Sequence, residues 1–480
     1  MSTEHSVVIG AGMAGLLTAA VIGATGRAVT VLEQDQDQDQ GQGQDQDQGQ
    51  GQGPGKGQVQ GVPMPRGGVP QGRQPHVLLH QGLSAIEELL PGLRGELIAA
   101  GGVPLDTGDL AWLGERGWAP FGTPAFELVS ASRPLVEYLV RRRVAELPGV
   151  ELRDGARVRG LSRTANGTGP GTGTAAGGRW LVECFDASPV GADLVVDASG
   201  RSSRLPDWLG PLGIEQPATT VVDAGFGYAG RVYAAPPDHL GHVAGIVMLP
   251  VPGAPAGGVA LPVEGGRWLV AAVGAENHRP PRDPAGFDAF LSGLRDPALA
   301  DFTRRAHALG DITVHRRTHN VRRRYDRLPH WPDGLLVMGD ALCAFNPVYG
   351  QGITVAATQA LLLRQALATG TRPGWERRLI RRLHRAADLP WAIATGEDLR
   401  HIGDDAPVSA LDTLFGRWSG EVDRLAAHGN LRAQRALDRV YHLVGSPAGL
   451  LHPALLAAAV RGRLLGLPAP APRPPLATSR

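Results

Sequence analysis

A glycine-rich turn close to the N-terminus constrains the fold of this chain more than any other feature. The apolar run that ends at Ile9 leads into Gly10, and further glycines follow at 12 and 15 before a long apolar stretch. A second apolar run, Ala28–Leu32, is followed by the acidic residue Glu33. A strand, a GxGxxG turn, a helix and a second strand that ends in an acid form a dinucleotide-binding βαβ unit. The sequence therefore predicts an α/β chain that begins with a Rossmann-type domain.

Each position of this turn has a physical role in binding a dinucleotide. Gly10 permits the tight turn, Gly12 lets the backbone approach a pyrophosphate, and Gly15 lets the helix pack close to the strand. The free N–H groups at the helix start favour phosphate, and the carboxylate of Glu33 accepts hydrogen bonds from ribose hydroxyls. The predicted cofactor contacts of this unit are Gly10, Gly12, Met13, Ala14, Gly15 and Glu33.

Two later segments favour FAD over NAD as the cofactor. Asp193–Ser203 and Leu336–Ile353 each place an acidic residue and a glycine at the end of an apolar strand, where open α/β sheets bind ligands. Asp340 is expected to hold the ribityl chain of an extended FAD. The turn before the next helix is expected to present N–H groups to the flavin, and the positive helix end to stabilise the reduced ring. This segment adds Asp340, Pro347, Gly350, Gly352 and Ile353 to the predicted contacts.

These three segments together resemble the group A flavoprotein monooxygenases, the family of p-hydroxybenzoate hydroxylase and squalene epoxidase. Residues 68–83 and 339–357 are similar to segments of the FAD-dependent hydroxylases and epoxidases of secondary metabolism. The resemblance covers roughly residues 1–33 and 62–390. Two departures stand out: Ser199 replaces an Asp that is common in the family, and the sequence GDALC replaces GDAAH.

The resemblance implies an activity and two further cofactor contacts. It places Arg73 beside a mobile flavin ring and Arg133 against FAD. Enzymes of this family use NAD(P)H as a transient co-substrate and O2 to hydroxylate or epoxidise hydrophobic small molecules through a flavin C4a-hydroperoxide. Phenol hydroxylation gains from a base, whereas epoxidation needs none. No residue can be assigned as a catalytic base from the sequence.

Other flavoprotein functions fit the sequence to different degrees. None of the nine tryptophans has a second tryptophan two residues later, so the WxWxIP segment of flavin halogenases is missing. A disulfide reductase would need a CxxC and a second GxGxxG turn, which the chain lacks. An FAD-dependent reductase of isoprenoid double bonds and a non-redox, FAD-containing cyclase both remain open alternatives.

Bulk composition narrows the class of protein. The 480 residues exceed what one hydrophobic core supports, and the net charge of +1 gives no electrostatic basis for binding nucleic acid. Cys184 and Cys343 stand far apart and in no CxxC, so we expect neither a disulfide framework nor a metal site. The N-terminus has no basic leader and no membrane span. We therefore expect a cytoplasmic protein with a small-molecule partner, and the oligomeric state stays open.

The order of apolar runs predicts an FAD-binding domain that is interrupted by a β-sheet substrate domain and followed by a C-terminal helical region. Leu83–Gly102 is expected to form a helix pair broken at Pro91, Val150–Ser162 a hairpin, and residues 218–318 a largely antiparallel sheet. The predicted parts are 1–103, 129–217 and 321–390 for FAD binding, 104–128 and 218–320 for the substrate sheet, and 391–480 for the helical region.

Three further features of the sequence concern the surroundings of the cofactor and the substrate. His315 and His319 stand among six arginines, which indicates a solvated strand or loop near the nicotinamide entrance more than a phosphate patch. Asp398 is expected either to face the substrate pocket or to cap a helix. The aromatic candidates for the pocket lining are Trp112, Trp118, Phe121, Phe126, Phe226 and Tyr228.

The segment 34–60 consists almost entirely of Gln, Asp and Gly. Val59 is its only core-forming apolar side chain, so the segment cannot offset the entropy of ordering its backbone. We interpret it as a disordered insertion in a surface loop, just after Glu33.

Deletion of Asp35–Gln58, with a short turn in its place, should therefore leave folding and FAD content unchanged. Long surface loops contribute little to stability whether they are kept or removed. Thermal denaturation and the visible flavin spectrum of the purified deletion variant would check this. A melting temperature lowered by many degrees would show instead that the segment packs against the protein.

Overall fold

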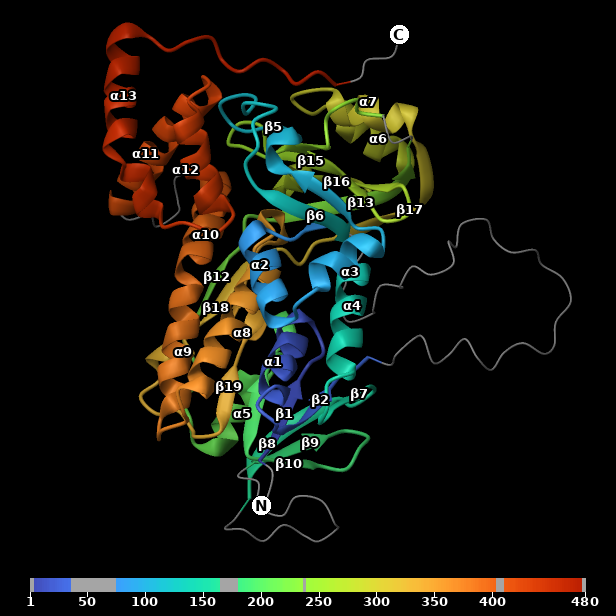
Figure 1. Cartoon of the computed structure of the whole chain (residues 1–480), viewed down its shortest axis with the longest axis vertical. Coiled ribbons are helices and arrows are strands. Elements are labelled where there is room, and N and C mark those ends of the chain that lie inside the picture. Colours follow the sequence, from blue (N-terminus) through green and yellow to red (C-terminus); the bar gives the residue numbers. More distant parts are fainter. Residues whose placement is uncertain (1–3, 36–74, 165–179, 236–238, 403–409, 477–480) are drawn as a thin grey trace, which may run out of the picture.

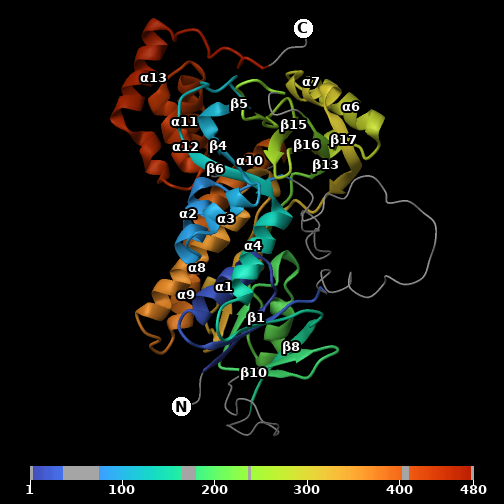
Figure 2. The same cartoon turned by 45° about the vertical axis from the view of Figure 1, so that its right-hand side comes forward.

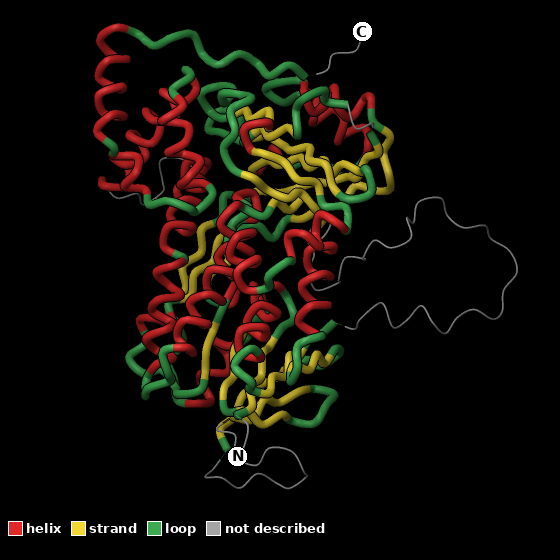
Figure 3. Tube along the Cα trace, in the orientation of Figure 1, coloured by secondary structure: helices red, strands yellow, loops and turns green. Residues whose placement is uncertain are grey.

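The computed structural model describes residues 4–35, 75–164, 180–235, 239–402 and 410–476. Most of the Gln/Asp/Gly insertion and the predicted flavin contact Arg73 lie outside these residues. Figure 3 shows the strands gathered mainly in two groups toward opposite ends of the long axis, with helices between and beside them.

The first group is a five-stranded sheet in which every neighbouring pair is parallel. Its strand order is β19-β11-β1-β2-β7, so the N-terminal strand lies at the centre. Helix α1 (Met13–Gly23) packs against α4 (Arg133–Ala145) and α8 (Gly352–Ala368) (Figure 1). The strands are β1 (His5–Ile9), β2 (Ala28–Leu32), β7 (Val150–Arg153), β11 (Leu194–Asp197) and β19 (Leu335–Val337).

Most elements expected from the sequence in this half are confirmed, including the helix pair broken at Pro91. Helix α2 spans His80–Leu89 and α3 spans Leu93–Ala99. The Rossmann-type α/β fold is also confirmed, because the parallel sheet and its crossover helix have the expected order.

The hairpin expected at 150–162 is wrong. Strand β7 pairs with β2 in parallel, with Val29 opposite Val150. Strand β8 (Val158–Arg163) pairs instead with β9 (Trp180–Cys184) in a separate sheet with β10 (Val190–Ala192). A local alternation of apolar residues shows that a segment favours a strand, but it does not identify the strand with which the segment pairs.

The second group is a six-stranded sheet with the order β17-β13-β16-β15-β14-β5. Its pairs are antiparallel, as expected, except that β14 pairs with β5 in parallel. The strands are β5 (Leu110–Leu113), β13 (Phe226–Ala234), β14 (Gly245–Met248), β15 (Ala256–Val263), β16 (Arg267–Ala275) and β17 (His307–His315).

The two faces of this sheet bury different side chains, because successive residues of a strand point to opposite faces. One face packs against α6 (Pro284–Ser292) and α7 (Ala298–Arg305) around the buried ring of Phe302. That ring lies 5.0 Å from Trp268 and 4.6 Å from His239. The other face carries Phe226 and Tyr228.

Two small sheets connect the halves. One joins β3 (Pro75–Val77), β4 (Val103–Asp106) and β6 (Glu127–Ser132), and the last of these continues directly into α4. The other joins β12 (Thr219–Val222), β18 (Asn320–Arg323) and β20 (Cys343–Ala344).

The C-terminal part is helical, as the sequence predicts, and lies alongside the six-stranded sheet in both views (Figures 1 and 2). The tail that follows α13 returns to this sheet: Arg473 forms two 2.9 Å hydrogen bonds with Asp296, and Leu476 packs against the α6–α7 side. No helix in the described ranges is long and apolar enough to cross a membrane. The helices of this part are α10 (Asp388–Ile402), α11 (Ala410–Ala427), α12 (Leu431–Tyr441) and α13 (Pro453–Leu465). Helix α9 (Trp375–Ala386) precedes them and packs against α8.

Candidate functional site

The predicted cofactor residues meet at one edge of the parallel sheet. Because β1, β2, β11 and β19 all run in the same direction, their carboxyl ends lie at that edge. The chain passes from β1 to β2 on one side and reaches β11 and β19 on the other. The strand order therefore reverses next to β1, and such a point is the usual place for a ligand in an open α/β sheet.

An added Cβ at Gly10 or Gly15 would collide with the backbone, whereas one at Gly12 would not. Gly10 has φ +96°, and a Cβ there would lie 2.7 Å from the carbonyl oxygen of Ala198. A Cβ at Gly15 would lie 1.8 Å from the carbonyl oxygen of Gly10. A Cβ at Gly12 would meet nothing within 4 Å. The first two glycines are therefore required by the fold, whereas no described atom of the chain requires a glycine at position 12.

Glu33 lies directly after β2 and is 9% exposed. Its Oε2 accepts a hydrogen bond of 2.8 Å from the backbone N–H of Ala11, inside the glycine turn. Its Oε1 accepts one of 3.2 Å from the N–H of Asp35. The carboxylate is thus held beside the turn, where a ribose next to a pyrophosphate would need an acceptor.

The segment after β19 touches both the glycine turn and the start of α8. A Cβ at Gly339 would lie 2.5 Å from the Cβ of Ala14, and one at Gly352 would lie 3.7 Å from Oδ1 of Asp340. The side chain of Gln359, on α8, accepts a 2.7 Å hydrogen bond from the N–H of Gly339. Asp340 is therefore placed between the two helix starts that the sequence assigns to FAD.

The positive charges of three arginines act on the carboxyl group of Asp340. Burial raises the pKa of this carboxyl, and the positive charges of Arg201, Arg133 and Arg323 oppose the shift. Arg323 donates to the carbonyl oxygens of Asp340 (3.3 Å) and Ala341 (3.1 Å), and Arg201 donates to that of Phe345 (2.7 Å). These guanidinium groups hold the loop after β19 in place.

Arg201 and Arg323 were not among the residues assigned from the sequence. Arg201 lies within the Asp193–Ser203 segment that the sequence assigns to the cofactor, but the sequence does not indicate the carbonyl groups that it binds. The predicted contact Arg133 begins α4 and pairs with Glu137 at 2.8 Å, with both side chains largely buried. Its charge reaches Asp340, which agrees with a place at the cofactor site.

The turn before α8 has the form expected for a flavin contact. Pro347–Tyr349 is a single 3-10 turn, Gly350 has φ +65°, and α8 begins at Gly352. Gln351 is 1% exposed, and neither its amide oxygen nor its amide nitrogen has a partner among the described residues. A buried amide without partners is costly, so its presence at a helix start fits a ligand with polar ring atoms. The predicted contact Ile353 is partly buried against the core of the parallel sheet.

These observations fit FAD as a group: an open glycine position at one helix start, an acidic side chain between, and an orphaned amide at the second helix start. They do so in the order in which an extended FAD presents its pyrophosphate, ribityl chain and ring. No group of three His, Cys, Asp or Glu side chains suited to a metal ion occurs in the described part of the chain.

Of the two interpretations of Asp398, the helix cap is wrong, because Asp398 lies within α10. The side chain is 0% exposed, and its place next to the substrate pocket stays a prediction. It accepts hydrogen bonds from Asn320, Asn346 and Tyr349. The sequence carries no signal for this grouping, because the three donors come from distant segments.

The arginine-rich segment 315–327 is solvated only in part, which corrects the expectation of a solvated strand or loop. His315 is 6% exposed and Arg322 is 5% exposed. Arg322 pairs with Asp388 at 2.5 Å and lies over the ring of Trp391. A buried guanidinium needs such a partner, and α10 supplies it only in the folded chain.

The six aromatic candidates for the pocket lining lie on both faces of the sheet. Trp118 and Phe121 belong to the core under α6 and α7, so their assignment to the pocket is wrong. Phe226 and Tyr228 pack with Val348 of the Pro347–Tyr349 turn. The ring of Trp112 lies 5.2 Å from that of Tyr441 on α12, and Phe126 lies 4.8 Å from His442.

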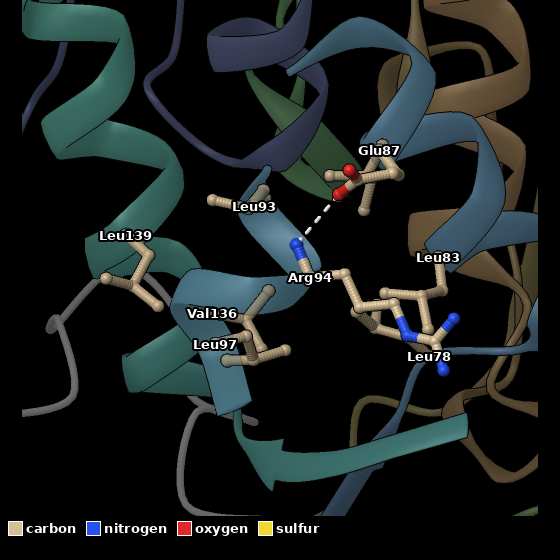
Figure 4. A pocket seen from close by; sticks show the side chains of 9 residues that line it. Leu78, Leu83, Glu87, Leu93, Arg94, Leu97, Val136 and Leu139 are labelled. Atoms are coloured by element: carbon tan, nitrogen blue, oxygen red, sulfur yellow. Dashed lines mark hydrogen bonds between the residues drawn. The ribbon is translucent and has the colours of Figure 1, made fainter. Parts of the chain in front are cut away.

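A small apolar cleft lies between α2, α3 and α4 (Figure 4). Glu87 accepts hydrogen bonds there from the N–H groups of Gly92 and Arg94, and so caps the start of α3. None of the predicted cofactor residues lines this cleft, so we do not assign it to the substrate. Its lining consists of Leu78, Leu83, Ile86, Glu87, Leu93, Arg94, Leu97, Val136 and Leu139.

Comparison with known proteins places the chain in a family. No family model matches it. It is 31% identical over 489 aligned residues to protein Rv3254 of Mycobacterium tuberculosis (strain ATCC 25618 / H37Rv), and the match covers 92% of each chain. The chain belongs to the family of Rv3254.

Solved structures show the fold that the Rv3254 family shares with flavoproteins. The flavin-dependent brominase Bmp2 is 15% identical and has a TM-score of 0.63 over 95% of this chain and 99% of its own. PqsL of Pseudomonas aeruginosa, a probable FAD-dependent monooxygenase, is 16% identical, with a TM-score of 0.56 over 83% and 99%. The Diels-Alderase PyrE3 of pyrroindomycin biosynthesis is 15% identical, with a TM-score of 0.55 over 92% and 80%. The fold is therefore that of flavin-dependent monooxygenases and their relatives.

The different environments of Gly12 and Gly15 give a test of the glycine turn. Gly12→Ala should melt at the temperature of the FAD-free wild type, because its Cβ meets no protein atom, yet it should bind FAD at least about tenfold more weakly. Gly15→Ala should lose about 1–3 kcal/mol or more of stability through the backbone clash. Thermal denaturation and fluorescence titration with FAD would separate the two effects. Wild-type FAD affinity in Gly12→Ala would contradict the assignment.

Proposed function

We propose that this member of the Rv3254 family is an FAD-dependent monooxygenase. It would use NAD(P)H and O2 to hydroxylate or epoxidise a hydrophobic small molecule, in keeping with a role in secondary metabolism. One observation carries the proposal: the open Gly12 position, Asp340 and the unpartnered Gln351 follow one another along the carboxyl edge of the parallel sheet.

The residues of this edge would divide the binding of FAD between them. The start of α1 would receive the pyrophosphate, Glu33 a ribose, and Asp340 the ribityl chain. The Pro347–Gly352 turn would offer N–H groups to the ring, and the positive end of α8 would stabilise negative charge there. Bound FAD supplies the hydride acceptance and the activation of oxygen that the protein's own side chains do not provide.

The substrate would lie against the face of the six-stranded sheet opposite α6 and α7. That face presents Phe226 and Tyr228 next to Val348 of the turn, and aromatic contacts with α12 extend it toward Trp112. Apolar walls next to the ring would exclude water, which a reactive oxygen donor requires. NAD(P)H would visit rather than reside, because the sequence has a single GxGxxG turn.

A non-redox cyclase is the second candidate. The observation that favours it is the similarity in fold to PyrE3, a Diels-Alderase. A brominase activity like that of Bmp2 is disfavoured, because the chain lacks the paired tryptophans of flavin halogenases. Dependence on oxygen separates a monooxygenase from a cyclase and from a reductase of double bonds.

The identity of the cofactor gives a direct test. The purified protein should be yellow and should release FAD, not FMN, on denaturation, as chromatography of the supernatant would show. Glu33→Ala should weaken FAD binding by about 1.5–3 kcal/mol, the usual contribution of a hydrogen bond to a charged group. Glu4→Ala, which removes an exposed carboxylate paired with Arg27, is the matched control and should bind FAD normally. Release of FMN would refute the assignment.

The proposed reaction is tested by isotope labelling. NADPH oxidation should be slow alone and should rise with a compound drawn from a panel of aromatic and polyene substrates. Mass spectrometry should then find one atom of ¹⁸O from ¹⁸O2 in the product. Gly352→Val should abolish this turnover, because its side chain would reach Asp340 and block the approach of the ring. Label that came from H2¹⁸O would contradict oxygen transfer, and anaerobic turnover without NADPH would favour the cyclase.

A further inference from the structure

A buried carboxylate on α10 gathers three side chains from other elements. Asp398 is 0% exposed. It accepts hydrogen bonds from Nδ2 of Asn320 at 2.6 Å, from the hydroxyl of Tyr349 at 2.7 Å and from Nδ2 of Asn346 at 3.1 Å. Asn320 belongs to β18, whereas the other two belong to the turn before α8.

Asn346 extends this network within the turn. Its Oδ1 accepts hydrogen bonds from the hydroxyl of Tyr228 at 2.8 Å and from the N–H of Val348 at 3.2 Å. Its N–H donates to Oδ1 of Asn320 at 2.7 Å. The residue before the 3-10 turn and the last residue of that turn are thus tied to one carboxylate.

We propose that Asp398 is a positioning residue that holds the Asn346–Gly350 turn in the conformation that meets the flavin ring. The inference rests on the proposed FAD site. Asp398 acts through Asn346 and Tyr349, because its own oxygens are buried and occupied. The helical region that begins at α10 would thereby help to set the geometry of the ring end of the site.

The chemistry of the network favours an ionised carboxylate. All three described partners donate to it, and of these only the hydroxyl of Tyr349 could accept a hydrogen bond in return from a protonated carboxyl. The titratable groups that face the network are Tyr349 from the turn, Tyr228 from β13, Asp223 from the segment after β12, and Glu397 on α10 itself.

The electrostatic setting makes this dependence measurable near neutral pH. Burial raises the pKa of Asp398 to about 6, the charge of Asp223 adds to the shift, and the three donors oppose it. Because the shift is upward, the carboxyl takes up a proton as the pH falls through about 6. The three hydrogen bonds then lose the negative charge that strengthens them, and the turn should loosen.

The experiment compares the binding affinity for FAD with that for ADP, which corresponds to one half of FAD. FAD reports on both ends of the site, whereas ADP reports on the glycine turn alone. Fluorescence titration with FAD and competition with ADP would be run at pH 8 and pH 5.5 on the wild type, Asp398→Ala, Asp398→Asn and Tyr349→Phe. Glu376→Gln is the matched control: Glu376 is 4% exposed and binds the N–H of Gly334, just before β19 and therefore at the far end of that strand from Asp340.

Asp398→Ala should raise the Kd for FAD about tenfold or more at pH 8 and leave the Kd for ADP unchanged. Tyr349→Phe should raise the Kd for FAD less, and it carries the same test if Asp398→Ala does not fold. Wild-type affinity for FAD, but not for ADP, should fall between pH 8 and pH 5.5. In Asp398→Asn the affinity for FAD should be lower at pH 8 and independent of pH.

The outcomes separate this inference from the proposed function. If the wild type binds FAD and all three variants bind it equally well, the positioning role is overturned while the FAD site stands. A parallel loss of FAD and ADP affinity in the variants would also overturn it, since that pattern reports general loosening of the fold. A wild type that binds ADP but not FAD would refute the FAD site and, with it, the inference.

Discussion

The approach of Gly15 to the carbonyl oxygen of Gly10 sets the geometry on which the rest of this structure depends. A single Cβ at Gly15 would lie 1.8 Å from that oxygen, so only glycine lets α1 start so close to β1. The start of α1 is then directed at the carboxyl edge of the sheet. The segments after β11 and β19 close around it, with the backbone of Ala198 against Gly10 and Gly339 against Ala14. A shift of α1 would therefore also displace the segments that contain Ala198 and Gly339.

Two carboxylates of the proposed site are stabilised in contrasting ways. Asp340 lies in the positive field of three arginines, two of which also bind the backbone of the loops around it. Asp398 is held by neutral donors. Burial raises the pKa of both carboxyls, and this shift is opposed by guanidinium charges at Asp340 and by hydrogen bonds from neutral groups at Asp398.

The six-stranded sheet contacts the turn before α8 and also presents an apolar face. Its α6–α7 face is a closed aromatic core around Phe302, while the opposite face brings Phe226 and Tyr228 to the turn before α8. Tyr228 belongs to both systems, because its ring packs in this apolar cluster and its hydroxyl bonds Asn346. The wall proposed for the substrate and the turn proposed for the flavin are thus parts of one packed unit.

The sequence by itself determined the local elements of this protein and the residues of its glycine turn. Gly10 and Gly15 are required by sterics that act over a few residues, and the apolar runs of β1, β2, β11 and β19 are long enough to mark buried strands. The sequence also led to Asp340 and the Pro347–Gly352 turn, because each follows directly on such an element.

Only the tertiary structure decided which strands pair and which distant side chains meet. Strand β7 joins β2 rather than β8, and the alternation of Val150–Ser162 is compatible with either partner. Trp118 and Trp112 look alike in the sequence, but they lie on opposite faces of the sheet. Asp398 finds Asn320 and Asn346 across 78 and 52 residues of chain, and Arg201 finds the carbonyl oxygen of Phe345 across 144. Contacts at such separations depend on the packing of whole elements, and no local pattern of residues encodes them.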